Sequence, residues 1–237
     1  MKRFVLIAAL LLPSCVPQFS EAKTAATLTD DARNLARDPS ATGRARFTDA
    51  QILGFLNEGQ NDAIAATLCI QKAYVVDTSS GSVYYDLPSD FIQIMRVTSD
   101  DQRLEEKSPA KLDIANTEWE LETGEPLNYF INFSSRTKIG IYPYPNSNSS
   151  TETLKIEYYA QADTMVAGST PFNGITEFTP FHHMLSYYAA AQMGYIDGLI
   201  GQADRYFQRY AIYRQQFNDY CRARPGYFPS VNVAPSR

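Results

Sequence analysis

Apolar side chains recur at helical spacing in the first part of the chain, over residues 22–70. This spacing predicts two amphipathic helices, the first over Ala22–Asp38 with Thr29 as its N-cap. The second helix is predicted to begin at Thr48, because Gln51 follows three residues later and completes a capping box. Its predicted buried face consists of Ile52, Leu53, Leu56, Gln60, Ala63, Ile64 and Thr67.

The pattern changes to alternating apolar and polar positions over residues 72–165, which predicts a β region inserted between helices. Ala73–Asp77 and Val83–Leu87 are predicted strands, joined by a turn at Ser79–Gly81. A short helix is predicted over Ser108–Ala115, with a proline in its first turn. Further strands are predicted at Phe91–Val97, Tyr129–Phe133, Lys138–Tyr142 and Thr153–Ala160.

Helical spacing returns over residues 179–222, where two long aromatic helices are predicted. Thr179 is the predicted cap of the first, and Pro180 lies in its first turn. The predicted buried faces consist of Phe181, Leu185, Tyr188, Gln192, Tyr195, Ala203, Tyr206, Phe207, Tyr210, Tyr213, Phe217 and Tyr220. The sequence predicts that these helices form a hairpin.

Together these elements predict an α+β fold. We expect an antiparallel bundle of about four helices, an inserted and mostly antiparallel β region, and an extended C-terminal tail. Residues 22–224 are predicted to form one domain, and residues 225–237 the tail. The proline-rich tail is too short to bury enough apolar surface to fold alone.

Residues 1–21 are predicted to be either a signal-like export leader or an N-terminal extension. Lys2 and Arg3 precede an apolar run over Phe4–Leu12, which is the arrangement of a secretory signal. The run is too short to span a membrane. Cys15 ends a segment similar to a lipobox, although Pro13 departs from that pattern.

Composition narrows the class of partner. The chain has 16 Tyr and 13 Phe, which suits either an aromatic core or subunit interfaces, where amphipathic rings are favoured. The formal net charge is −5. Charge-driven binding of DNA or RNA needs clustered Lys and Arg, so this balance argues against it.

The sequence contains no constellation typical of catalysis or metal binding. Cys69 and Cys221 lie on predicted apolar helix faces, where buried thiols are expected. His182 and His183 are adjacent, so on a helix they point about 100° apart and do not suit one metal ion. The carboxylates around Glu118 lie in polar sequence, which indicates a solvated face. We therefore expect no enzyme activity, no cofactor and no metal.

From Thr27 to Arg222 the chain resembles the head-to-tail adaptor (connector) proteins of tailed bacteriophages. The resemblance rests on the order of several short segments. They are Phe47-Thr48-Asp49 with Ile52, Leu56, Asn57, Glu58 and Gln60; Tyr85 to Phe91; Gly124-Glu125-Pro126 with Tyr129; Ile139 to Pro145; and Tyr188, Tyr206, Tyr210 and Phe217 in the closing helices. The resemblance implies a non-enzymatic virion protein of the neck that is assembled in the host cytoplasm.

Such adaptors form a dodecameric ring beneath the portal, extend the DNA channel and present a lower surface to the tail or nozzle. The resemblance thus implies the portal, the tail or nozzle protein and further copies of the chain as partners. Genome DNA would pass through the lumen without sequence-specific binding. The predicted portal-docking anchors in the tail are Tyr227, Phe228 and Val231. The predicted tail-facing loop contains Asn146, Ser147 and Asn148.

The leader leaves an alternative open. If it functions, the chain is an exported lipoprotein of the periplasm or outer membrane, acylated at Cys15, that uses the same bundle as a binding module. A third class, a carbohydrate-active enzyme, would rely on acids such as Glu118 or Glu120.

Overall fold

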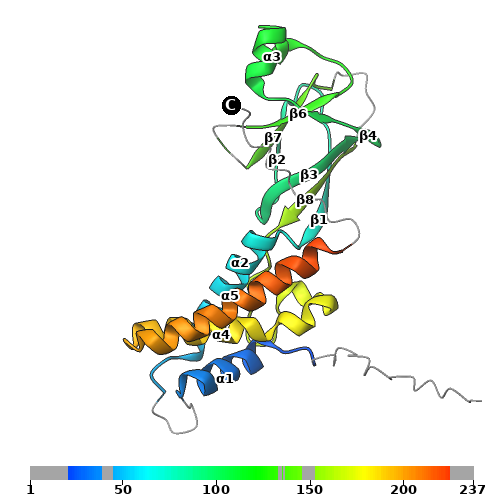
Figure 1. Ribbon diagram of the computed structural model, residues 1–237. Coiled ribbons are helices and arrows are strands. Elements are labelled where there is room, and N and C mark those ends of the chain that lie inside the picture. Colours follow the sequence, from blue (N-terminus) through cyan, green and yellow to red (C-terminus); the bar gives the residue numbers. More distant parts are fainter. Residues whose placement is uncertain (1–20, 39–44, 133–134, 136, 146–152, 225–237) are drawn as a thin grey trace, which may run out of the picture.

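The computed structural model describes residues 21–38, 45–132, 135, 137–145 and 153–224. Figure 1 shows an elongated molecule in which the long helices gather at one end and the strands extend from them. The short helix α3 (Pro109–Ala115) lies at the far end of the β region.

The helical body consists of α1 (Ala25–Ala36), α2 (Asp49–Thr67), α4 (His183–Ile196) and α5 (Ile200–Arg222). Helix α4 packs against the other three. Its small residues make this possible, since Ala189, Ala190 and Ala191 are fully buried. A Cβ added at Gly59 of α2 would lie 2.8 Å from the Tyr188 ring of α4, so glycine allows this close approach.

The cap of α1 differs from the prediction. Helix α1 begins at Ala25, and its N-cap is Thr24, whose hydroxyl accepts a hydrogen bond from the Thr27 amide. Thr29 was wrongly predicted as the cap. It lies inside the helix and donates its hydroxyl proton to the Ala25 carbonyl instead. A threonine hydroxyl can accept a hydrogen bond at an N-cap or donate one to a carbonyl inside a helix. The helix begins at Ala25, so Thr24 is the N-cap.

The cap of α2 confirms the prediction. The Gln51 amide donates to the Thr48 hydroxyl, and the Thr48 amide donates to the Gln51 side chain. This capping box satisfies two of the amide groups that a helix start leaves unpaired.

The strands form two four-stranded sheets. The first has the order β1 (Gln71–Asp77), β8 (Thr153–Ala160), β3 (Phe91–Ser99) and β4 (Gln102–Arg103), all antiparallel. The second has the order β2 (Tyr84–Asp86), β7 (Lys138–Tyr142), β6 (Asn128–Ile131) and β5 (Glu105–Glu106). Only its β5–β6 pair is parallel among the described strands.

The first two predicted strands and the turn between them are present, but the two strands do not pair with each other. Strand β1 pairs with β8, with Tyr74 opposite Ile156, whereas β2 pairs with β7, with Tyr85 opposite Ile139. The turn that joins them therefore carries the chain from one sheet to the other. A turn between two strands therefore does not by itself decide which strands pair.

The start of the third long helix is also later than predicted. Residues Thr176–Phe181 form a 3₁₀ helix, η4, and α4 begins only at His183. Thr179 forms no side-chain cap and is itself buried. Another 3₁₀ turn, η3 (Phe172–Gly174), precedes η4, so that Phe172 and Phe178 pack with ring centroids 6.0 Å apart.

The α+β class and the antiparallel character of the β region are confirmed. A second, smaller core lies at the far end of the β region, where Leu112, Trp119 and Phe130 are buried together. Trp119 begins the 3₁₀ helix η2 (Trp119–Leu121). This core holds α3 against the second sheet.

Candidate assembly surfaces

Several predicted site residues lie outside the described part of the chain. They are Cys15, the loop residues Asn146, Ser147 and Asn148, and the tail residues Tyr227, Phe228 and Val231. The described residues instead locate the supports of the helical body, two exposed apolar surfaces and a pair of bonded cysteines.

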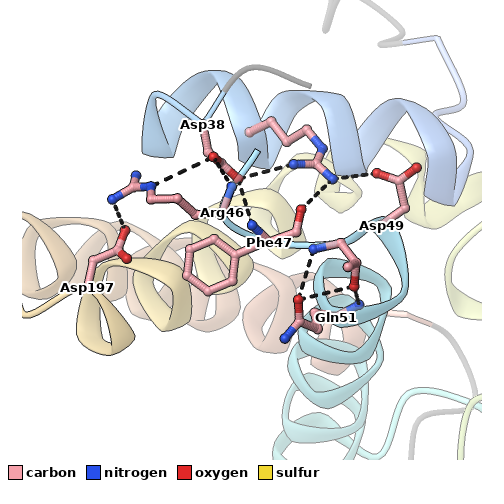
Figure 2. Close-up of polar contacts among 8 residues, drawn as sticks. Asp38, Arg46, Phe47, Asp49, Gln51 and Asp197 are labelled. Atoms are coloured by element: carbon pink, nitrogen blue, oxygen red, sulfur yellow. Dashed lines mark hydrogen bonds and ion pairs between the residues drawn. The ribbon is translucent and has the colours of Figure 1, made fainter. Parts of the chain in front are cut away.

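A buried ion-pair network holds the connection between α1 and α2 (Figure 2). Arg33 in α1 pairs with Asp38 at 3.1 Å and with Asp49 at 2.5 Å, and it donates to the Phe47 carbonyl at 2.9 Å. Only 4% of Arg33 and 2% of Asp38 are exposed. The network ties the end of α1 to the start of α2, because Arg33 bonds both to Asp38 just after α1 and to Phe47 and Asp49 at the start of α2.

The same network reaches the α4–α5 turn. Asp38 accepts hydrogen bonds from the backbone amides of Arg46 and Phe47, at 2.8 and 3.2 Å. The Arg46 side chain pairs with Asp197 at 2.5 Å, and Asp197 lies directly after α4 (Figure 2). The ion pair between Arg46 and Asp197 thus ties the connection between the first two helices to the closing hairpin.

A second polar link joins α2 to α5. The Tyr210 hydroxyl donates to Asp62 at 2.5 Å, and Arg214 pairs with the same carboxylate at 2.6 Å. Burial, together with the hydrogen bond to Asp62, raises the pKa of Tyr210 above its usual range. The phenol therefore remains a donor at all physiological pH values.

The adjacent histidines are structural. Burial lowers the pKa of His182 to about 4, so its imidazole is neutral at pH 7. His183 packs edge-on against Tyr213, with centroids 4.3 Å apart, and burial lowers its pKa too. Across the described segments, no three His, Cys, Asp or Glu side chains gather closely enough to hold a metal ion.

Large apolar side chains are exposed at the α4–α5 turn. Ile196 is 64% exposed and Ile200 is 61% exposed, and Leu199 lies between them at 46%. Gly198 forms the turn with φ +72°, a conformation that favours glycine. The ion pair between Asp197 and Arg46 holds this turn against the connection between α1 and α2. An exposed apolar turn held in this way is suited to a contact with another chain.

The far end of the β region exposes a second apolar surface, which we call the acidic tip (residues 105–127). Ile114 is 86% exposed and Leu121 is 74% exposed. Seven carboxylates and two lysines in this segment give it a net charge of −5, equal to that of the whole chain. All seven carboxylate residues are exposed. The solvated face predicted around Glu118 is thus present, but it surrounds apolar side chains that were not predicted to be exposed.

A disulfide corrects the prediction of two buried thiols. Cys69 follows α2 and Cys221 lies in the last turn of α5, and the two are bonded with their Cα atoms 5.7 Å apart. Both are buried, as predicted. The pairing could not be read from the sequence, because 152 residues separate the two cysteines and no spacing pattern links them.

Among the described residues, no helix has the length and apolar character needed to cross a membrane. No curated protein matches the chain. A family model described as SU10 adaptor protein matches residues 23–232, which is most of the chain.

That match covers both helical parts and the β region between them, in the order that the structure shows. The family is one of structural proteins that join the phage head to the tail, in the neck of the virion, where they associate with portal and tail components. The chain therefore belongs to the SU10 adaptor protein family of phage head-to-tail adaptors.

Proposed function

We propose that this adaptor assembles into a ring, with the dodecamer as the expected form, beneath the portal of a tailed phage. The ring extends the DNA channel and offers its lower surface to the tail or nozzle protein. The observation that carries the proposal is the separation between the start of the docking tail, held on the helical body by the Arg224–Glu177 pair, and the exposed apolar side chains of the acidic tip. Figure 1 shows that the tip lies at the end of the β region far from the helical body. A chain that joins two partners needs two such separate surfaces.

Portal docking is assigned to the C-terminal tail, with Tyr227, Phe228 and Val231 as anchors. The described chain ends at Arg224, which forms an ion pair with Glu177 and lies 5.1 Å from the Phe178 ring. This contact supports the assignment, because it fixes the start of the tail to the helical body. Aromatic anchors are favoured in such an interface, since they bury a large area with few rotatable bonds.

Deleting residues 227–237 is expected to abolish portal binding and leave a folded chain, because the buried core lies within the described residues. The measurement is co-sedimentation with the purified portal, alongside circular dichroism of the chain alone. Alanine at Tyr227, Phe228 and Val231 together should have the same effect, whereas alanine at Ser230 and Asn232 should have none. Undiminished portal binding by the deletion variant would refute the anchor role.

Tail attachment is assigned to the acidic tip together with the predicted loop of Asn146, Ser147 and Asn148. Charge complementarity indicates that the partner surface is basic and has an apolar centre. A neighbouring copy of the tip does not fit this description, because two surfaces of net charge −5 repel each other. The partner is therefore the tail or nozzle protein.

Serine at both Ile114 and Leu121 is expected to lower tail attachment about 10-fold or more, since each large apolar side chain buried contributes about 1.5–3 kcal/mol. Both side chains are exposed, so the fold should be unaffected. The measurement is the fraction of tailed particles in electron micrographs, and serine at Val166 and Ile212, which are exposed apolar residues outside the tip, is the control. Equal numbers of tails in the two variants would contradict the assignment.

DNA passage requires a lumen that does not retain DNA. The net charge of −5 supports this, because like charges disfavour contact with phosphates. We propose that the genome passes through without sequence-specific binding.

A further inference from the structure

The disulfide joins two positions that matter for assembly. Cys69 lies between the end of α2 and the start of β1 at Gln71, where the chain leaves the helical body for the β region. Cys221 lies three residues before Arg224, after which the predicted docking tail begins. Closing the bond therefore fixes the origin of the tail to the junction of the helical body and the β region.

The geometry suits a disulfide without a change of fold. The Cα atoms lie 5.7 Å apart, within the usual range for bonded cysteines. Cys69 is 5% exposed and Cys221 is 1% exposed, so the pair is shielded from most reagents. Access requires the last turn of α5 to open, and terminal helical turns open at the lowest free-energy cost in a fold.

A disulfide is not expected to form in the compartment where the particle is assembled. This step rests on the proposed function, which places assembly in the host cytoplasm. Cytoplasmic thiols are kept reduced, and stable structural disulfides are rare there. Release of particles by lysis exposes them to an oxidising medium. The bond is thus expected after assembly rather than during it.

We propose that Cys69 and Cys221 are a post-assembly oxidation site, open during assembly and closed in released particles. Each sulfur loses its proton, a sulfur–sulfur bond forms, and two electrons and two protons pass to the oxidant. The oxidant is a small-molecule disulfide, which is reduced to two thiols through a mixed-disulfide intermediate. The closed form locks the end of α5 to the junction of the helical body and the β region.

The open form remains folded, because other contacts hold the end of α5. Phe217 is fully buried and packs against Phe172 and Phe178, with centroids 5.1 and 5.0 Å apart. Arg224 pairs with Glu177 beyond the bond. The disulfide therefore adds stability to a structure that already exists, and assembly does not depend on it.

The timing is tested by trapping thiols in a Cys15→Ser background, in infected cells quenched with acid before lysis and in released particles. Polyethylene-glycol maleimide is added under denaturing conditions, and each free thiol retards the band in electrophoresis. The expected result is two free thiols in cells and none in particles. Two free thiols in particles would overturn the proposal. No free thiols in cells would also overturn it and would favour export of the chain.

The stabilising effect of the disulfide is tested on the purified full chain. Oxidised parent protein should melt on the order of 10 °C higher than the same protein in reductant, because the bond closes a loop of more than 150 residues. Cys221→Ala should melt identically with and without reductant and should bind the portal as the reduced parent does. An oxidised parent that melts like the reduced one would overturn the locking role. Failure of the chain to enter particles would instead refute the proposed function, and the melting comparison is independent of that result.

Discussion

Replacing Arg33 with methionine is expected to lower the free energy of unfolding by about 3–5 kcal/mol. Methionine fills similar space but leaves Asp38, which is 2% exposed, with only the more distant Arg46, at 3.7 Å, as a charged partner. The Phe47 carbonyl loses a hydrogen bond as well. Removing one member of a buried pair costs more than the pair contributes, since the remaining charge has no access to water. Urea unfolding followed by circular dichroism measures the change.

Two further variants separate the charge effect from the loss of side-chain volume. Arg37→Met removes an exposed arginine from the end of the same helix and should change stability by less than about 0.5 kcal/mol. Adding Asp38→Asn to Arg33→Met should recover part of the loss, because asparagine leaves no buried charge and its one side-chain oxygen still accepts from one of the two amides that bond to Asp38. A loss below about 1 kcal/mol for Arg33→Met would show that the network does not stabilise the helical body.

Replacing Phe217 with aspartate is expected to prevent folding of the helical body at pH 7. The ring is fully buried, and its centroid lies 5.0 Å from that of Phe178 and 5.0 Å from that of Phe181. Loss of a buried phenylalanine costs about 3–5 kcal/mol, and burial of an unpaired carboxylate adds several more. The sum is comparable to the whole stability of a domain, about 5–15 kcal/mol.

The adjacent position provides the control. Gln216 is exposed on the outer face of α5, so Gln216→Asp adds the same charge without burying it. This variant should melt within about 2 °C of the parent, whereas Phe217→Asp should show no cooperative transition. A cooperative transition for Phe217→Asp at the temperature of the parent would show that this face of α5 is not buried.

Helices were predicted well where local side chains decide their ends. The capping box of Thr48 and Gln51 is complete within four residues, so the sequence alone identifies it. The cap of α1 was predicted wrongly as Thr29, because Thr24 and Thr29 have the same side-chain chemistry. The start of α4 was missed, since residues before it form a 3₁₀ helix whose aromatic side chains pack at long range.

Strand positions were predicted, but strand partners were not. The period-two pattern identifies Ala73–Asp77 and Thr153–Ala160 as strands, yet it contains no information that they pair. Their register depends on apolar side chains more than 75 residues apart in the chain, and the Ser79–Gly81 turn suggested a nearer partner. Pairing at that distance is decided by the whole core rather than by local sequence.

The candidate surfaces were also predicted only in part. The acids of the tip were visible in the sequence as a solvated face, but Ile114 is exposed only because Leu112 takes the buried side of α3. Helical spacing alone could have predicted this orientation, since side chains two positions apart on a helix point about 200° apart. The Cys69–Cys221 bond was not available, because it depends on the relative positions of the ends of α2 and α5.

The proposal that the chain forms a ring beneath the portal is tested most directly by electron microscopy and mass measurement of the purified full chain, alone and mixed with the portal from the same genome. The account predicts a ring of this chain seated on one face of the portal, with the β regions pointing away from it. A chain that remains monomeric and leaves the portal bare at micromolar concentrations would contradict the account.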